Sequence, residues 1–186
     1  MKLYQHPEGH VFYRKMAHGR PKISHGEGIY LYDESGKRYM DGSGGPMVVN
    51  VGHGRSEIVQ AITKQAQQAA YIHAIMFTSE AAEQLSSELA QIVPIPNARF
   101  FYLSSGSEVV EGAIKLARQI QQARGENDRH HIVSRSQSYH GMTLGALSVS
   151  GRPGLRRPFL PMMHDMPHIT PPYPYRDVAG GVAVAD

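Results

Sequence analysis

The hydrophobic pattern near the start of the chain has the two-residue period of a strand. Apolar and aromatic residues dominate 28–32 and 37–40, and they flank the polar stretch 33–36, which ends in glycine. Alternation around a glycine-containing turn predicts a β-hairpin. The preceding residues, 1–27, are polar and irregular, and no element is predicted for them. The glycine-rich stretch 41–46 predicts a flexible loop whose backbone can approach a ligand closely.

The pattern then changes to the period of a helix. Ser56 precedes the first helical stretch and Ser79 precedes the second, and a serine at the N-cap position accepts a hydrogen bond from the first helical turn. Pro94 and Pro96 end the second helix. We expect both helices to serve as packing elements.

A third and longer helix is predicted after Ser107, a favourable N-cap residue. Glu108 and Glu111 would lie in its first turn, where the helix dipole stabilises negative charge. Gly125 follows the last helical position, as is typical of a helix end. The assignment rests on apolar residues at helical spacing, namely Val109, Val110, Ala113, Ile114, Leu116, Ala117 and Ile120.

Short apolar stretches at 100–103 and 131–134 lie on either side of this helix and predict strands, and 143–149 predicts a further short helix. Strands that alternate with helices predict an α/β fold, with a mostly parallel sheet and flanking helices. In such a sheet the loops 104–107 and 138–141 would both follow the carboxyl ends of strands. Ligands bind at that edge of α/β sheets.

The turn Ser104-Ser105-Gly106-Ser107 is the first candidate for chemistry. A strand, a small-residue turn and a helix in this order place several backbone N–H groups at a helix N-terminus, which suits a phosphate. Such turns also cap many helices that bind nothing. Considered alone, the turn therefore favours a structural role.

Composition and charge exclude several functions. The chain has 186 residues with no cysteine, so disulfides and thiolate chemistry are absent. The formal charge of +3 is small and the basic residues are scattered, so we expect no nucleic-acid partner. No apolar run is long enough for a membrane span and no signal peptide is recognisable, which favours a cytoplasmic protein. Residues 151–176, rich in proline and arginine, predict a long surface loop. His164 and His168 have the spacing of two residues on one helix face. Pro167 between them disfavours a helix, so we expect no metal site.

The stretch 101–118 resembles the phosphate-binding segment of the class III aminotransferases, which are fold-type-I enzymes that use pyridoxal 5′-phosphate. The segments 26–33, 39–42, 50–54 and 138–146 are similar to further segments of that family, in the same order. The resemblance covers most of the chain from about residue 26 onward. Within the family it is closest to the ω-amino-acid:pyruvate and related amine aminotransferases.

The resemblance implies a cofactor site. Gly106 and Ser107 would hold the phosphate through backbone N–H groups and the hydroxyl, and Ser105 flanks them and shapes the turn. Tyr139 lies where the family stacks an aromatic ring on the pyridine ring, and His140 beside it would line the site. The alternatives are a half-buried loop tyrosine and a hydrogen-bonded structural histidine.

The resemblance also places Pro46, Met47 and Phe77 in the substrate pocket, although ordinary core packing would explain them equally. The Schiff-base lysine and the acid that protonates the pyridine nitrogen come from later segments in the family. We therefore expect no catalytic residue in this chain. None of its lysines lies in a matching segment; these are Lys2, Lys15, Lys22, Lys37, Lys64 and Lys115.

These features predict the N-terminal portion of an aminotransferase. Residues 1–50 would form a small-domain segment with the hairpin, and residues 51–186 the first part of the cofactor-binding large domain, truncated at Asp186. The complete enzyme would be a homodimer that transfers an amino group between an amine or ω-amino acid and an oxo acid such as pyruvate. The remainder of the enzyme would lie on the same or a second polypeptide, and this chain alone would be inactive. The alternatives are a catalytically dead module that binds a phosphorylated ligand or a partner chain, and an aminomutase or racemase.

Overall fold

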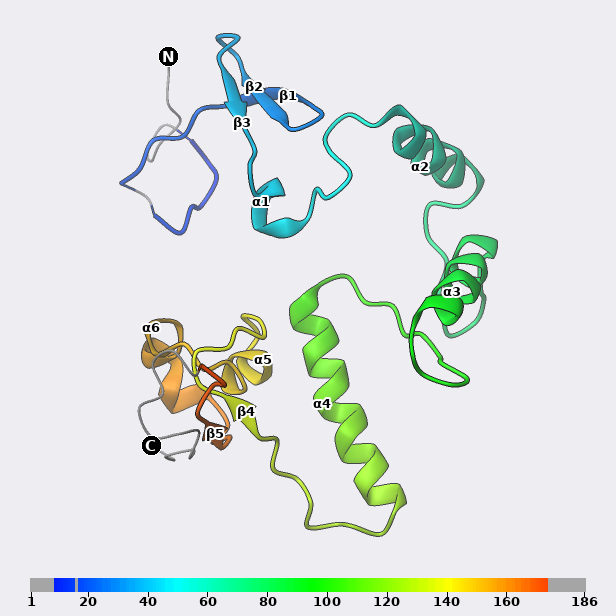
Figure 1. Ribbon diagram of the computed structural model, residues 1–186, viewed down its shortest axis with the longest axis vertical. Helices are drawn as coiled ribbons and strands as arrows, with labels where there is room; N and C mark the ends of the chain where they lie inside the picture. Colours follow the sequence, from blue (N-terminus) through cyan, green and yellow to red (C-terminus); the bar gives the residue numbers. More distant parts are fainter. Residues whose placement is uncertain (1–8, 16, 174–186) are drawn as a thin grey trace. The chain divides into compact units, whose positions relative to one another are not determined.

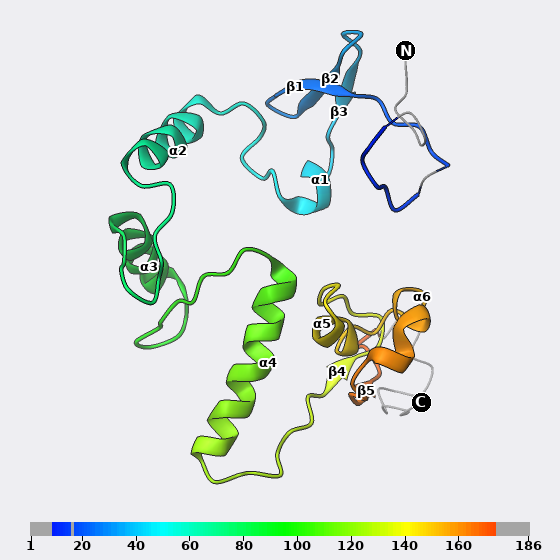
Figure 2. The same ribbon diagram turned by 180° about the vertical axis from the view of Figure 1, so that it is seen from behind.

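The computed structural model describes residues 9–15 and 17–173. The chain divides into two compact units, Met1–Ser87 and Glu88–Asp186, and Figures 1 and 2 show their elements from opposite sides. The division falls within helix α3 (Glu80–Ile92), so the predicted domains 1–50 and 51–186 stay a prediction. No helix in the described ranges is both long and apolar enough to cross a membrane.

The first unit contains an antiparallel sheet in the order β1 (Ile23–Glu27), β2 (Tyr30–Asp33), β3 (Arg38–Met40). The hairpin of β2 and β3 confirms the predicted hairpin. Strand β1 corrects the expectation that residues 1–27 form no element. Its polar sequence gives no alternating signal, and the strand instead depends on pairing with β2, where the rings of His25 and Tyr32 stack at 4.6 Å.

The Asp33 carboxylate fixes the turn of this hairpin. Its Oδ1 accepts hydrogen bonds from the Ser35 hydroxyl (2.6 Å), the Ser35 N–H (2.9 Å) and the Lys37 N–H (3.0 Å). Its Oδ2 accepts one from the Tyr39 hydroxyl (2.8 Å). The bond from the Ser35 hydroxyl has the largest effect on the pKa of Asp33. Together these bonds outweigh the effect of burial and lower that pKa to about 2. Although its side chain is buried, the carboxylate therefore stays ionised at neutral pH.

The remaining elements of the first unit are helical. Helix α1 (Gly44–Met47) lies in the stretch predicted as a loop, but Gly45 and Pro46 have non-helical backbone angles within it. Helix α2 (Ser56–Gln68) confirms the first predicted helix, whereas its expected cap is wrong, because Arg55 is the N-cap residue and Ser56 is already helical. For α3 the prediction is confirmed, since the Ser79 hydroxyl accepts a hydrogen bond from the Ala82 N–H at 3.2 Å.

Helix α4 (Gly106–Ala123) is the longest helix described in the second unit. Its N-cap is Ser105, not Ser107 as predicted, because the helix begins at Gly106 and the Ser105 hydroxyl accepts a hydrogen bond from the Glu108 N–H at 3.3 Å. Glu111 consequently lies in the second turn and not the first. The predicted stop at Gly125 is confirmed by its φ of +80°, which favours glycine.

The strands of the second unit are shorter than predicted. Residues 100–103 form no strand, and of the expected strand 131–134 only Ser134 is paired, together with Arg135, as β4 (Ser134–Arg135). A strand exists only with a partner, and the partner found in this part of the chain is β5 (His168–Ile169), which runs parallel to β4. Strand β5 lies in the region expected to be a surface loop.

That expectation for residues 151–176 is wrong over its described part, 151–173. Helix α6 (Pro153–Arg156) and the 3₁₀ helix η1 (Arg157–Met162) precede β5 there. Proline at the first or second position of each helix is compatible with helical geometry, because those positions lack an intrahelical N–H partner. Residues 174–176 lie outside the described residues.

The predicted helix at 143–149 is confirmed as α5 (Leu144–Ser148), and it forms the buried centre of the second unit. Ala146 and Leu147 are at most 1% exposed, and Ser148 and Ser150 are fully buried. The two buried hydroxyls remain satisfied, since Ser148 donates to the Leu144 carbonyl and Ser150 to the Ala146 carbonyl. Helix α5 thus anchors the loop 138–142 that precedes it.

Candidate functional site

The first turn of α4 presents free hydrogen-bond donors. The Glu108 N–H donates to the Ser105 hydroxyl and the Val109 N–H to the Ser105 carbonyl. Among the described residues, no acceptor binds the Gly106 or Ser107 N–H. A Cβ atom added at Gly106 would meet nothing within 4 Å, so the space beside the turn is open. Two free N–H groups at a helix N-terminus, next to open space, suit an anion.

The loop 138–142 lies directly against this turn. The Met142 N–H donates to the Ser107 hydroxyl at 3.0 Å, across 35 residues of sequence. Gly141 permits the approach, because its φ is +141° and an added Cβ would lie only 2.6 Å from Ser107 Oγ and 2.9 Å from Ser107 Cα. The two loops that the sequence placed at one sheet edge are therefore in contact, although 100–103 is not a strand.

A second contact lies one helical turn further along α4. The Glu111 carboxylate accepts hydrogen bonds from the Ala146 N–H (3.1 Å), the Gly145 N–H and the Thr143 hydroxyl. The bond from Thr143 contributes most to lowering the pKa of Glu111, and the two N–H groups and the electrostatic interaction with His164 add to it against burial. Glu111 is therefore a carboxylate bound to the N-terminus of α5.

The backbone around Tyr139 is held on both sides. The Gln137 N–H donates to the Gly151 carbonyl (2.8 Å), and the Gly151 N–H donates to the Ser138 carbonyl (3.0 Å). On the other side, the His140 N–H donates to the Ser150 hydroxyl at 2.9 Å. Gln137 itself has φ +67°, a strained value for a non-glycine residue. Tyr139 thus projects from a backbone that hydrogen bonds hold on both sides.

The Tyr139 side chain is available for contact. It is 51% exposed, and the Arg152 guanidinium carbon lies 5.7 Å from its ring centroid. This distance is compatible with a cation–π interaction. A flat, electron-poor ring could stack on the exposed part of the tyrosine. The structure therefore combines free N–H donors and an accessible aromatic ring on two adjacent loops.

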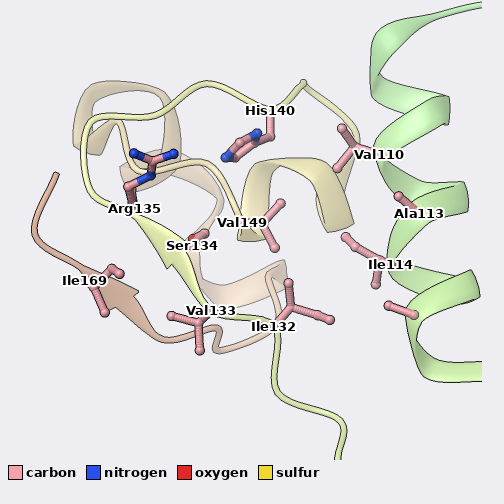
Figure 3. A pocket seen from close by; sticks show the side chains of 11 residues that line it. Val110, Ala113, Ile114, Ile132, Val133, Ser134, Arg135, His140, Val149 and Ile169 are labelled. Carbon is pink, nitrogen blue, oxygen red and sulfur yellow. The ribbon is translucent and has the colours of Figure 1, made fainter. Parts of the chain in front are cut away.

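His140 lies beside a cleft of about 430 Å³ between α4 and β4. Figure 3 shows Val110 and Ile114 projecting from α4 toward Val149, with His140 above Val149 in this view. Gly106 and Ser107 do not line this cleft. The predicted contact of His140 with a cofactor stays a prediction.

The predicted substrate residues all belong to the first unit. Pro46 and Met47 lie in α1, and Phe77 precedes α3. Met47 is 78% exposed with φ +62°, and Phe77 is 67% exposed. Ordinary core packing stays the alternative for these residues. Their assignment to a substrate pocket stays a prediction.

A histidine–carboxylate pair holds the α1 region against the sheet. Asp41 Oδ2 lies 2.9 Å from His53 Nε2, and Asp41 Oδ1 accepts a hydrogen bond from the Gly45 N–H at 2.9 Å. The Gly45 bond is the largest cause of the lowered pKa of Asp41. His53 also pairs with Gly28 through backbone bonds in both directions. Sequence reasoning assigned no role to either side chain.

Glu111, Gly141 and Gly145 are the residues of the second unit whose contribution the sequence did not reveal. The sequence shows only that Ser107 and Glu111 are four residues apart in the predicted helix. Helical residues with this spacing share a face.

In the described part of the chain, no group of three histidine, aspartate or glutamate side chains is placed to hold a metal ion.

Comparison with known proteins gives a consistent result. The family model described as class III aminotransferase matches residues 14–182. An uncharacterised aminotransferase of Schizosaccharomyces pombe is 40% identical over 170 residues, which are 91% of this chain and 37% of that protein. The uncharacterised aminotransferase YodT of Bacillus subtilis is 40% identical over 156 residues, 84% of this chain and 35% of that protein.

A solved structure shares the fold. An (S)-enantioselective omega-transaminase from Thermomicrobium roseum superimposes with a TM-score of 0.84 and 34% identity, over 93% of this chain and 40% of that one. This likeness confirms the predicted α/β fold class. The chain spans between about a third and two fifths of the length of these proteins.

Proposed function

Since the chain belongs to the class III aminotransferase family, we propose that it supplies the phosphate-binding turn and the ring-stacking tyrosine of a pyridoxal 5′-phosphate site. The single observation that supports this most strongly is the contact between the two loops. Met142 N–H donates to Ser107 Oγ, so that Tyr139 and the free N–H groups of Gly106 and Ser107 lie on adjoining backbone.

The residues present fit this cofactor. Its phosphate requires several donors, and the Gly106 N–H, the Ser107 N–H and the Ser107 hydroxyl can each provide one. The hydroxyl accepts from Met142, which leaves its own proton for a phosphate oxygen. Its pyridine ring requires a flat apolar surface, and the half-exposed Tyr139 belongs to the loop that contacts the turn. Ser105 shapes the turn by capping α4.

The reaction that we propose for the complete enzyme is transamination. When bound, pyridoxal phosphate supplies a carbonyl group that takes an amino group from one substrate and returns it to another. In this proposal, the residues of this chain bind and orient the cofactor. The α4 turn would hold the phosphate, and Tyr139 would fix the plane of the ring. We propose that the covalent lysine and the acid at the pyridine nitrogen belong to the part of the enzyme that corresponds to the rest of its relatives' length.

We propose an amine or ω-amino acid as amino donor and an oxo acid such as pyruvate as acceptor. The likeness to an omega-transaminase supports this choice. Pro46, Met47 and Phe77 are the candidate substrate contacts. A homodimer and a cytoplasmic location belong to the same proposal.

Paired substitutions in the phosphate turn and the stacking residue test this function. Tyr139→Ala should weaken binding of pyridoxamine 5′-phosphate by about fivefold, because stacking on an aromatic face contributes on the order of 1 kcal/mol. Ser107→Ala removes one hydroxyl and should weaken binding less than Ser107→Pro, which also removes an N–H donor. Isothermal titration calorimetry on the full chain measures these affinities.

Phe12→Ala is a suitable control, because Phe12 is 89% exposed and lies in the first unit. The proposal requires that this variant binds as the wild type does. Equal affinities for the wild type, Tyr139→Ala and Ser107→Pro would contradict the assignment. They would instead favour a module that does not bind the cofactor at this place.

A further inference from the structure

The N-terminus of α5 is capped by a side chain from another helix. Thr143 is its N-cap residue, yet the Thr143 side chain makes no capping bond. Its hydroxyl donates instead to the Glu111 carboxylate, which also accepts from the Gly145 and Ala146 N–H groups of the first turn of α5. Glu111 therefore performs from α4 the task that a serine or aspartate N-cap performs locally.

Two glycines make this contact possible. A Cβ atom added at Gly145 would lie 2.7 Å from Glu111 Oε1, and one added at Gly141 would lie 2.6 Å from Ser107 Oγ. Each α4 residue, Ser107 or Glu111, thus faces a glycine, and the interval is four residues on both segments. The two contacts fix both the distance and the register between α4 and the segment 139–146.

We propose that Glu111 is a positioning residue of the cofactor site, which sets where Tyr139 stands relative to the Gly106–Ser107 turn. The inference rests on the proposed function, because the turn and the tyrosine form one site only if one ligand contacts both. The turn belongs to α4, and Tyr139 belongs to the loop that leads into α5. Ser107 and Glu111 hold these two parts together from successive turns of one helix face.

The proposed role of Glu111 predicts different effects on the binding of two ligands. Inorganic phosphate needs only the α4 turn, whose N–H groups do not depend on α5. Pyridoxamine 5′-phosphate needs the turn and the tyrosine at the correct separation. Loss of the Glu111 contact should therefore weaken binding of the second ligand and leave binding of the first unchanged.

The test compares variants of the full chain by amide hydrogen exchange and ligand titration, both followed by NMR. Glu111→Gln keeps the side-chain volume but replaces one acceptor oxygen with a donor that faces N–H groups. Thr143→Val removes the hydroxyl donor, and Thr143→Ser restores it. Glu126→Gln makes the same chemical change at an exposed position beyond α4 and serves as the matched control.

We expect Glu111→Gln to speed exchange of the Gly145 and Ala146 amides by about tenfold, since a hydrogen bond to a charged group is lost. The same variant should weaken pyridoxamine 5′-phosphate binding by about tenfold and remove the response of the Tyr139 ring, with phosphate affinity unchanged. Thr143→Val should act in the same direction, while Thr143→Ser and Glu126→Gln should behave as the wild type does.

The outcomes distinguish the two proposals. Unchanged exchange in Glu111→Gln and Thr143→Val would overturn the positioning role, even if the wild type binds the ligand as proposed. Faster exchange with unchanged ligand affinity would overturn the link between Glu111 and the cofactor site. A wild-type chain in which pyridoxamine 5′-phosphate perturbs neither the turn nor Tyr139 would refute the proposed function itself.

Discussion

Neighbouring residues of the same type have different tasks in this chain. Ser104, Ser105 and Ser107 surround Gly106, and the sequence alone favoured Ser107 as the cap of α4. The helix starts at Gly106, so Ser105 caps it and the Ser107 hydroxyl is left to bind Met142. The sequence identifies the turn, but the residue that caps it depends on where the helical angles begin, which is not encoded by residue type.

Ser105→Ala should lower the free energy of unfolding by about 1 kcal/mol, because the first turn of α4 loses its side-chain acceptor. Urea unfolding followed by circular dichroism measures the change. Ser104→Ala is the matched control, since Ser104 is exposed and precedes the cap. A larger loss in Ser104→Ala than in Ser105→Ala would contradict this assignment of the cap.

The Asp33 carboxylate makes the stability of the hairpin dependent on pH. Its pKa falls from 3.8 to about 2 on folding, so the ionised form stabilises the folded hairpin. That contribution is fully present above pH 3.8 and is lost as the pH falls through about 2. A carboxyl carbon NMR titration should give the low pKa for Asp33. Asp33→Ala should lower the melting temperature more than Asp33→Asn, which retains an acceptor oxygen, and a titration midpoint at the ordinary value would disprove this interpretation.

At the scale of elements, the sequence predicts the helices better than the strands. The helical period identifies α2, α3, α4 and α5, because each helix satisfies its backbone hydrogen bonds within itself. Strands depend on partners elsewhere in the chain. The polar β1 is formed by pairing with β2, and β5 forms in a proline-rich stretch by pairing with β4. Conversely, the apolar stretch 100–103 is not a strand.

The contact between α4 and the segment before α5 predicts that replacement of Gly141 destabilises the fold. Gly141→Ala places a Cβ atom 2.6 Å from Ser107 Oγ at a φ of +141°. The loop must then move away from the turn, at a cost of about 2 kcal/mol in unfolding free energy. Gly154→Ala is the control, because an added Cβ there meets nothing within 4 Å. Denaturant unfolding of both variants tests this, and equal stability of Gly141→Ala and Gly154→Ala would contradict the close approach.

At the scale of the whole molecule, the sequence predicted the family and the pairing of two loops in one candidate site. Several sequence segments resemble those of the class III aminotransferases in the same order, and the family model matches residues 14–182. The α/β alternation placed 104–107 and 138–141 at one edge, and the Met142–Ser107 bond joins these regions. The sequence could not reveal the role of Glu111, because its partners Thr143, Gly145 and Ala146 are defined only by the packing of α5 on α4.

The central claim is that one ligand contacts the α4 turn and Tyr139 together. An NMR titration of the isotope-labelled full chain with pyridoxamine 5′-phosphate tests it most directly, because this ligand has the ring and the phosphate but no aldehyde to react with lysines. We predict that the Gly106 and Ser107 amide signals and the Tyr139 ring signals shift together along one binding curve, while inorganic phosphate shifts only the amides. Saturable binding that leaves Gly106, Ser107 and Tyr139 unperturbed would contradict the account.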